Sequence, residues 1–437
     1  MKTTLIKNTR YFNTSLGTLE SANLLLAGNL SQLTILPPKE PVPEVDLELD
    51  GSDCLTIPGL FDLCASLREP GYKHKGTLKS ETLAALKGGI TTLCCTPRTR
   101  PVNDTEAITR LIKDNAAAVN QARVLPVGAL TKGNKGSRLS ELNSLKKSGC
   151  IAVSHPRGVP IDCQTLHRCF QYAKSHDLTV FFEPEEGSLA GGCMHDGALS
   201  SRLGLVGVPE LAETIALSRA LLLAEQTRVR LHIGQISCGR SVAMIAEAKS
   251  RGVDLSADVA IQNLVLTEND IQAFNAAYHA QPPLRTEQDR QTLLQAVNNG
   301  TIDAIVSQHQ PHELAAKLAP FAETEAGMSN LDTLLSLGIQ LVQNKELELA
   351  AFLRSVTTNP AKIAGINNYC LEDGKLCDLA IVNPNRTWLV NPQSMASSGK
   401  NSPFIGQTLP GTVLWTFVAG RCVFDRHRDG DCSQVPF

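Results

Sequence analysis

The central part of the chain, from Ile57 to about residue 365, alternates between short apolar runs and amphipathic segments. Continuous apolar runs predict buried strands, and apolar residues every three or four positions predict helices. The predicted strands begin near Gly59, Thr91, Arg123, Cys150, Leu178, Arg228, Val253 and Thr301. The predicted helices span residues 80–87, 104–119, 163–175, 209–226, 239–251 and 286–299. This alternation predicts an α/β fold, a (β/α)8 barrel of the TIM type.

A doubly wound open sheet is the main alternative to the barrel. No G-x-G-x-x-G sequence follows the first predicted strand, which argues against a dinucleotide-binding sheet of that kind. We therefore prefer the barrel.

The two ends of the chain have a different pattern, typical of short strands. Residues 24–36 contain a Gly-Asn turn between apolar runs, as in a hairpin, and residues 37–43 form a proline-rich connector. Apolar or alternating runs return at 376–382 and 412–424. The simplest arrangement pairs both ends in one small β domain, residues 1–57 and 366–437, with the barrel at 58–365.

Composition indicates an ordinary water-soluble protein. The 437 residues carry a net charge of −2, without the clustered basic face that a nucleic-acid partner requires. The 13 cysteines are an odd number at irregular spacings, and Cys94 and Cys95 are adjacent in an apolar run. We expect reduced thiols and a cytoplasmic location. The first residues lack an apolar signal core, and no apolar stretch is long enough to span a membrane.

One motif at the first predicted strand has a close parallel. Residues 58–71 read PGLFDLCASLREPG, which resembles the P-G-x-x-D-x-H-x-H-x-R-x-P-G motif of dihydroorotases, members of the cyclic amidohydrolase family. Further segments fit the same family at residues 88–92, 97–101, 188–192, 201–204, 282–285, 303–305, 358–361 and 401–406. The resemblance covers nearly the whole chain, and the split β domain is also that of the family.

The resemblance implies a zinc centre at the barrel mouth that activates water for hydrolysis or closure of a cyclic amide. The positions of the metal ligands and of the catalytic aspartate are changed in this sequence. They are Cys64, Ser66, His155, Glu183, Gln235 and Gln308. Serine is a poor zinc ligand, and an amide cannot act as a general base near neutral pH. We therefore predict no catalytic residues, no bound metal and no cofactor.

Other ligand-type side chains are expected to have structural roles. His232 and Gln235 are three positions apart, so on a strand they would face opposite ways. His309 and His312 are expected to pack in the loop after the last strand. Cys64 is expected to be a small buried residue.

Three residues occupy positions that the resemblance links to substrate binding, namely Arg68, Arg98 and His312. Arg68 stands where the family holds the substrate carboxylate, and it could still bind an anion. It could instead form a salt bridge, with Glu69, Glu183, Glu185 or Glu186 as candidate partners. Arg98 replaces the usual asparagine and would alter or fill the pocket.

The predicted helix at 209–226 is strongly apolar on one face, through Leu211, Ile215, Leu222 and Leu223. We expect this face to pack on the barrel, although residues 221–224 could also leave a patch for a partner.

The lost ligand positions and the intact scaffold motifs resemble those of inactive dihydroorotase-like chains. Such chains associate with the catalytic chain of aspartate carbamoyltransferase in a mixed dodecamer. The resemblance thus implies a non-catalytic assembly subunit in pyrimidine biosynthesis, with self-dimerisation also possible. Two alternatives stay open. One is an enzyme of changed chemistry, with Cys64 as nucleophile or His309 as base. The other is an anion sensor that uses Arg68 and Arg98.

Overall fold

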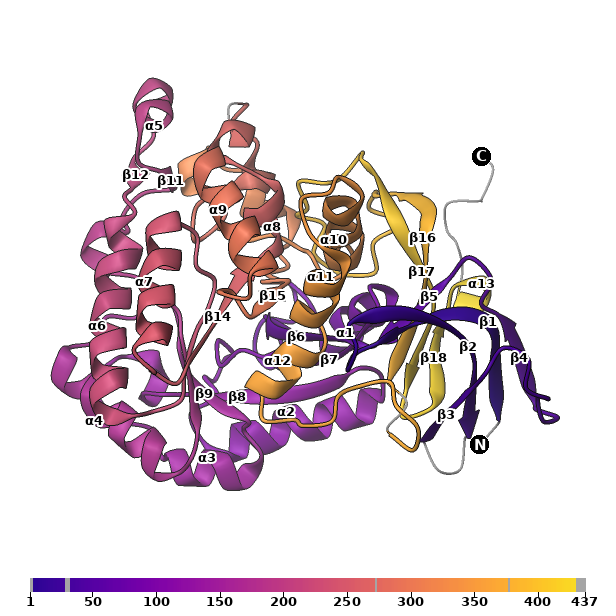
Figure 1. Cartoon of the computed structure of the whole chain (residues 1–437). Helices are drawn as coiled ribbons and strands as arrows, with labels where there is room; N and C mark the ends of the chain where they lie inside the picture. Colours follow the sequence, from indigo (N-terminus) through magenta and orange to yellow (C-terminus); the bar gives the residue numbers. More distant parts are fainter. Residues whose placement is uncertain (1–2, 28–31, 272, 376–377, 430–437) are drawn as a thin grey trace.

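The computed structural model describes residues 3–27, 32–271, 273–375 and 378–429. A ring of parallel strands surrounded by helices lies beside a separate sheet, which contains both ends of the described chain (Figure 1). This is the predicted α/β architecture, a barrel with a β domain built from both ends. Within the described ranges, no helix is long and apolar enough to cross a membrane.

The barrel strands follow one another around the ring in chain order. They are β6 (Leu60–Ala65), β7 (Ile90–Cys95), β8 (Arg123–Ala129), β9 (Ala152–His155), β10 (Thr179–Phe182), β13 (Leu231–Ile233), β14 (Leu255–Ala260) and β15 (Ala304–Val306). A parallel bridge between Ala65 and His309 joins the last strand region to the first. Most barrel strands are buried along their whole length, which explains why they read as continuous apolar runs.

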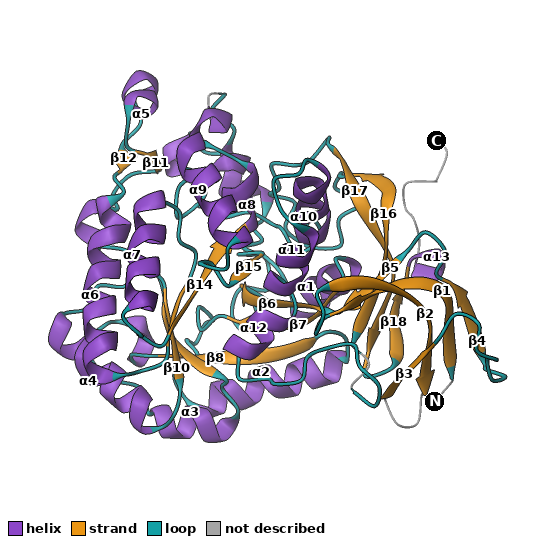
Figure 2. Cartoon of the chain, in the orientation of Figure 1, coloured by secondary structure: helices purple, strands orange, loops and turns teal. Residues whose placement is uncertain are grey.

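Helices cover the outside of the barrel (Figure 2). They are α1 (Leu78–Lys87), α2 (Glu106–Val119), α3 (Leu142–Ser148), α4 (Cys163–Ser175), α6 (Leu211–Thr227), α7 (Gly239–Ser250), α8 (Ile261–Val265), α9 (Glu287–Asn298), α10 (Leu334–Gln343), α11 (Leu349–Ser355) and α12 (Thr358–Ile363). Short 3-10 helices lie in the loops at Lys132–Asn134, Gly187–Leu189, Glu268–Ile271, Ala276–Tyr278, Leu314–Lys317 and Phe321–Glu323.

The boundaries of α4 show how local sequence sets these helices. Asp162 caps the first turn by accepting a hydrogen bond of 2.8 Å from the backbone N–H of Thr165. Leu166, Phe170 and Ala173 recur at helical spacing and are buried against the barrel. The predicted span of 163–175 is therefore confirmed.

An arm stands clear of the barrel (Figure 1). It consists of β11 (Met194–His195), α5 (Ala198–Leu203) and β12 (Gly207–Val208), and its two short strands pair in parallel. The arm leads directly into α6.

The orientation predicted for α6 is wrong. Leu211, Ile215 and Leu222 are 45%, 46% and 62% exposed, and Leu223 is only partly buried. The residues buried on the other side are Ala212, Glu213, Thr214, Ala216, Leu217, Ala220, Leu221 and Ala224. Small side chains let the helix approach its neighbours closely, and apolar residues on several sides of α6 obscured which side faces inward.

The separate sheet has the strand order β18-β17-β16-β5-β1-β2-β3, and β4 pairs with β1. Its strands are β1 (Thr4–Asn13), β2 (Thr18–Ala27), β3 (Gln32–Leu36), β4 (Leu47–Asp50), β5 (Leu55–Pro58), β16 (Leu379–Leu389), β17 (Thr408–Val418) and β18 (Arg421–Asp425), followed by α13 (Arg426–Asp429). β5 pairs with β1 on one side and with β16 on the other. The predicted hairpin at 24–36 matches β2 and β3, but its turn lies outside the described residues, and the limits 57/58 and 365/366 stay predictions.

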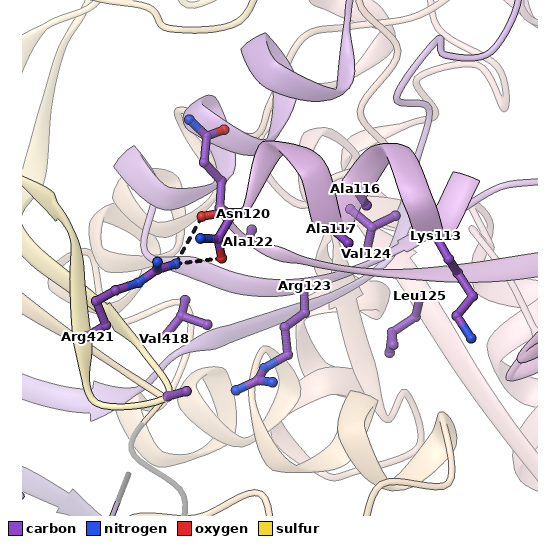
Figure 3. Close-up of a pocket in the computed structure, with 12 residues that line it drawn as sticks. Lys113, Ala116, Ala117, Asn120, Ala122, Arg123, Val124, Leu125, Val418 and Arg421 are labelled. Atoms are coloured by element: carbon purple, nitrogen blue, oxygen red, sulfur yellow. Dashed lines mark hydrogen bonds between the residues drawn. The ribbon is translucent and has the colours of Figure 1, made fainter. Parts of the chain in front are cut away.

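Polar contacts hold this sheet to the bottom of the barrel. Arg123, at the start of β8, donates two hydrogen bonds of 2.9 Å to the buried carboxylate of Asp378. Arg421 of β18 donates to the carbonyl and side-chain oxygens of Asn120, at the C-terminus of α2 (Figure 3). A groove of about 560 Å³ runs along this seam between α2, β8 and the β17–β18 turn.

The described cysteines are free thiols, and most of them are buried. This agrees with the expected reduced state. Cys377 and Cys432 lie outside the described residues.

Candidate functional site

The mouth of the barrel, at the C-terminal ends of its strands, is where enzymes of this architecture place their chemistry. A pocket there is lined by residues of six strands and of the loops that follow β7, β10 and β13. Its lining residues are Leu63, Cys64, Thr96, Pro97, Val127, Ser154, Phe181, Glu183, His232, Gly234, Gln235 and Asp258. The free volume is about 20 Å³, which has room for about one water molecule. The mouth is thus filled by the protein's own side chains.

Four side-chain amides fill much of this space in a single chain of hydrogen bonds. Asn330 Nδ2 donates to Gln262 Oε1 at 3.0 Å, and Gln262 Nε2 donates to Gln308 Oε1. Gln308 Nε2 donates to Gln235 Oε1 at 2.8 Å, and Gln235 Nε2 donates to Cys64 Sγ at 3.2 Å. We call Asn330, Gln262, Gln308, Gln235 and Cys64 the amide relay. It joins three of the altered positions, Cys64, Gln235 and Gln308, directly to one another.

Gln235 and Gln308 both lie just beyond the ends of their strands. Their φ angles are 53° and 47°, in the left-handed region that side chains rarely adopt. The backbone N–H of Gln235 donates to Asp258 Oδ1 at 2.6 Å, and Gln308 Nε2 also donates to the carbonyl of Gln281. Specific hydrogen bonds therefore hold both amides in place at the centre of the mouth.

The prediction that His232 and Gln235 face opposite ways is wrong. β13 ends at Ile233, so the alternation of a strand does not extend to Gln235, and both side chains line the same pocket. His232 nevertheless has a complete set of partners. Its Nε2 lies 2.8 Å from Asp258 Oδ2, and its Nδ1 lies 2.9 Å from Ser256 Oγ. This fits the structural role expected for His232.

The thiol of Cys64 is buried. Burial, followed by the nearby carboxylates of Glu183 and Asp258, raises the pKa of Cys64 well above its ordinary value. The thiol therefore stays protonated at neutral pH and is a weak nucleophile. Ser66, two positions on, is also buried, and its backbone N–H donates to the carbonyl of His309 at 2.8 Å.

The carboxylate of Glu183 is hydrogen-bonded to two arginine residues. Its Oε2 accepts a hydrogen bond from Arg98 Nη2 at 3.1 Å and another from the backbone N–H of Arg157 at 2.9 Å. Arg157 in turn lies 3.7 Å from Glu185. Arg98 therefore pairs with Glu183, one of the residues that line the pocket.

His155 is buried next to this group. Its ring stacks on Phe182 with centroids 5.3 Å apart, and its Nδ1 has no hydrogen-bond partner within the described residues. Burial lowers the pKa of His155 to about 4. The imidazole is therefore neutral at physiological pH.

Arg68 does not form any of the predicted salt bridges. Its Nε donates to the carbonyl of Pro311 at 3.0 Å, and its Nη2 lies 3.2 Å from His312 Nε2. Lys75 Nζ lies 3.3 Å from His312 Nδ1 and 2.5 Å from Glu325. Arg68 is thus hydrogen-bonded to the loop that carries His312. Two of the glutamates predicted to pair with it form other ion pairs, Glu69 with Lys73 and Glu183 with Arg98. Burial, then Arg68 and Lys75, lowers the pKa of His312 to about 3.

His309 is fully buried. Its Nε2 lies 2.7 Å from Glu81 Oε2, and its Nδ1 accepts a hydrogen bond from the backbone N–H of Asn330. Ser397 also donates to Glu81. Burial alone would raise the pKa of Glu81, but the contacts with His309 and Ser397 outweigh it and hold that pKa below its ordinary value. His309 thus ties α1 to the loop after β15, and it has no free nitrogen to serve as a base.

These residues do not fit the zinc centre that the family resemblance implies. Zinc requires several thiolate, imidazole or carboxylate ligands that converge on one point. Here the thiol is protonated, Glu183 is paired with Arg98, and Gln235 and Gln308 are hydrogen-bonded amides. The described residues contain no group of three or more histidine, cysteine, aspartate or glutamate side chains arranged to hold a metal.

Several members of this site carry no motif in the sequence. Gln262, Asn330 and Lys75 come from loops and from the short helix α8, and nothing in their local pattern marks them. Asp258 offered one signal, because it is an acidic residue inside the apolar strand β14.

Comparison with known proteins shows the family to which this chain belongs. A family model described as dihydro-orotase-like matches residues 54–241. A dihydroorotase-like protein from Pseudomonas aeruginosa is 46% identical over 373 residues, which cover 85% of this chain and 88% of the relative. The chain belongs to the dihydroorotase-like family.

Other dihydroorotase-like relatives extend this comparison. A protein named dihydroorotase from Syntrophus aciditrophicus is 39% identical over 384 residues, 88% of this chain and 90% of the relative. The solved structure of L-hydantoinase (dihydropyrimidinase) from Arthrobacter aurescens superposes with a TM-score of 0.85 at 24% identity, covering 97% of this chain and 96% of that one. At that identity the hydantoinase supports the shared fold alone.

Proposed function

We propose that this chain is a catalytically inactive dihydroorotase homologue that serves as an assembly subunit of aspartate carbamoyltransferase in the cytoplasm. The observation that carries the proposal is the amide relay. It places uncharged side chains, hydrogen-bonded to one another, at the barrel mouth next to the Arg98–Glu183 pair. Gln235 and Gln308 thereby replace two groups on which the family chemistry depends, a metal ligand and a general base.

The choice of partner rests on the family resemblance. Inactive dihydroorotase-like chains pair with the catalytic chain of aspartate carbamoyltransferase in a mixed dodecamer, and the same role in pyrimidine biosynthesis is proposed here. The relative from Pseudomonas aeruginosa is itself named dihydroorotase-like, whereas the less similar relative from Syntrophus aciditrophicus is named dihydroorotase. A lasting complex would require an interface of roughly 1,000 Å² or more with an apolar centre.

Co-expression of the two chains tests the proposal. Size-exclusion chromatography with light scattering should show one large particle that contains both chains. The carbamoyltransferase expressed alone should be smaller or less active. A carbamoyltransferase that elutes by itself, fully assembled and fully active without this chain, would show that the proposal is wrong.

A second candidate function is anion binding, because several cationic groups gather around His312. Arg68, Lys75 and Lys317 all act on its ring and lower its pKa. A thermal shift with dihydroorotate or carbamoyl aspartate, lost in an Arg68→Gln variant, would support a sensor. The other alternative, an enzyme with Cys64 as nucleophile or His309 as base, is less favoured. Cys64 is held as a thiol, and both nitrogens of His309 are engaged.

A further inference from the structure

The groove at the seam between the barrel and the β domain has an apolar lining that is open to solvent (Figure 3). We call this groove the seam groove. Its volume of about 560 Å³ is typical of binding sites, which measure roughly 300–1,000 Å³. Ala117 is exposed, and Ala116, Leu125 and Ala419 are half-buried. The apolar lining residues include Ala116, Ala117, Val124, Leu125, Val418 and Ala419.

One wall of the seam groove is a single face of α2. Lys113, Ala116, Ala117 and Asn120 lie at spacings of three and four, so their side chains share one side of the helix. The two alanines are short and leave the space between this helix and the β17–β18 turn unfilled. Lys113 and Asn120 mark the two ends of the wall, about 10 Å apart along the helix axis.

A positive charge without a counterion lies at the Asn120 end. The guanidinium of Arg421 donates to the carbonyl oxygen of Asn120 at 3.0 Å and to its side-chain oxygen at 2.9 Å. Both acceptors are neutral. Arg421 is exposed, and among the described residues it has no ion-pair partner. This end of the groove can therefore accept an anionic group.

A second positive charge without a counterion lies at the other end. Lys113 Nζ donates to the carbonyl oxygen of Ser148 at 3.2 Å, which is again a neutral acceptor. Lys113 is exposed and forms no ion pair within the ranges that the structure describes. Figure 3 shows Lys113 and Arg421 at opposite ends of the lining residues.

The middle of the seam groove carries no net charge. Arg123 also lines it, but this arginine donates two hydrogen bonds of 2.9 Å to the carboxylate of Asp378. That pair is electrically neutral. The groove therefore presents an apolar middle between two positive ends, and a ligand that fits it needs the opposite pattern.

We propose that the seam groove binds an extended segment of a partner protein, with two acidic residues three or four positions apart and small apolar residues between them. An extended chain rises about 3.3 Å per residue, so these acidic residues are about 10–13 Å apart. This spacing matches the separation of Lys113 and Arg421. A small ion with one charge compensates only one of them.

The two ion pairs at the ends fix the register of the segment, while its apolar residues cover Ala116 and Ala117. Extended segments that bind along a groove are a common mode of peptide recognition. The inference depends on the groove alone and not on the proposed carbamoyltransferase complex, so each can fail without the other.

A labelled peptide tests the groove. The probe is amidated Ser-Asp-Val-Ala-Asp-Ser with fluorescein at its N-terminus, titrated with the full chain at low salt. Fluorescence anisotropy should show saturable binding that weakens as salt is added. Ala117→Phe fills the groove and should weaken binding at least tenfold. Ala118→Phe, at the neighbouring exposed position outside the lining, is the matched control and should bind as the unmodified chain does.

Circular dichroism checks that both phenylalanine variants are folded. An unmodified chain that does not bind the probe saturably, or equal binding by the two variants, would overturn the proposal.

Charge exchange tests the two ends. Lys113→Glu or Arg421→Glu should each weaken binding of the probe by about tenfold at low salt. Lys79→Glu, at an exposed position on α1, is the charge control and should have little effect. The reversed peptide Ser-Lys-Val-Ala-Lys-Ser should bind the double variant Lys113→Glu with Arg421→Glu and not the unmodified chain. If the double variant still prefers the acidic probe, the assignment of the two ends is wrong.

Two further measurements distinguish other occupants of the groove. Sebacate is a small dianion with an apolar middle, and it should bind more weakly than the peptide. Tighter binding of sebacate that also depends on Lys113, Arg421 and Ala117 would assign the groove to a small molecule. A dimer of the full chain that Ala117→Phe dissociates in sedimentation velocity would assign it to a second copy. Either result would overturn the proposal.

Discussion

The side-chain amides of the barrel mouth form an uncharged network beside the Arg98–Glu183 ion pair, and two of them stand where a metal enzyme would place charged groups. In the amide relay each glutamine carbonyl oxygen accepts from the preceding amide, and the last amide donates to the thiol of Cys64. Asn330 Oδ1, at the start of the relay, has no hydrogen-bond partner among the described residues. The other relay groups are hydrogen-bonded to one another, as buried polar groups in a structural core must be.

Replacing one amide of the relay with a carboxylate should destabilise the protein. Gln308→Glu removes the donor that serves both Gln235 and the carbonyl of Gln281. The expected loss in the free energy of unfolding is about 1–3 kcal/mol, the cost of buried groups left unpaired. Urea unfolding measures it. Gln407→Glu, at an exposed position, is the control and should change stability little.

The second residue-scale prediction concerns activity. The chain should have no dihydroorotase activity in either direction with added zinc, because an amide at position 308 cannot act as a base. Cys64→His together with Ser66→His should not restore turnover, since Gln235, Gln308 and the Arg98–Glu183 pair remain. Turnover that follows the protein through purification would contradict both the prediction and the proposed function.

His155 should make stability depend on pH. Its folded-state pKa is about 4, against 6.5 in the unfolded chain, because burial favours the neutral ring. The unfolded chain therefore binds the proton first. His155 leaves stability unchanged above pH 6.5 and lowers it as the pH falls toward 4, by about 1.4 kcal/mol per pH unit.

A His155→Gln variant should lack this part of the pH dependence. Urea unfolding at about pH 7 and about pH 5 compares it with the parent chain. His74→Gln, with a side chain 60% exposed, should keep the parent's slope. An unchanged slope in His155→Gln would show that the pKa of His155 is the same in the folded and the unfolded chain.

Secondary-structure elements were predicted well where local sequence decides them. The span of α4 is set by the Asp162 cap and by a one-sided apolar pattern, and both are visible in sequence. The orientation of α6 was predicted wrongly because its leucines occur on several sides. Only three-dimensional packing reveals which of them face the barrel. α10 is not among the predicted helices, and it is buried on nearly all sides, so it reads as a long apolar run whose secondary structure is hard to assign from sequence.

The candidate site also has a part that local sequence predicts and a part that depends on the three-dimensional fold. The motif around residues 58–71 predicted Cys64 at the mouth, and Cys64 lies near the end of β6 and lines the pocket, whereas Ser66 and Arg68 follow the end of the strand. The partners of those residues could not be predicted. The amide relay joins positions up to 266 residues apart, from Cys64 to Asn330, and such contacts leave no local pattern in the sequence.

The strand β8 and the sheet β16–β17 are joined by the pair Arg123–Asp378, which allows a prediction at this scale. Arg123→Ala should leave the carboxylate of Asp378, which is only 4% exposed, without its cation. The expected destabilisation is roughly 2–3 kcal/mol, below the usual value for fully buried pairs because Arg123 is partly exposed. Arg421→Ala, which removes only exposed contacts to Asn120, should cost less than about 1 kcal/mol.

Thermal unfolding compares the two variants. If both substitutions lower the unfolding midpoint equally, the Arg123–Asp378 pair stabilises the contact between barrel and sheet no more than Arg421 does.

At the scale of the whole molecule, the largest apolar cluster spans both the barrel and the β domain. Phe12, Ile57 and Val413 from the sheet belong to the same buried cluster as Leu86 and Leu335 from the barrel helices. Units that share a core unfold together, so the chain should show a single cooperative transition.

Spectroscopy can test this directly, because both tryptophans lie in the β domain, Trp388 on β16 and Trp415 on β17. Their fluorescence reports on the sheet, whereas far-ultraviolet circular dichroism reports mainly on the barrel helices. The two denaturation curves should coincide. Separate midpoints would show that the β domain and the barrel are independent folding units.

The pairing of β5 with β16 has a consequence for how the protein is made. The ribosome releases β5 long before β16, since residues 59–378 lie between them. At about 5–20 residues per second, the edge of β5 waits roughly 15–60 s for its neighbour. During that time a nascent chain presents an open sheet edge, which is a site for aggregation. We therefore expect chaperones to protect the first strands of this protein until the last ones emerge.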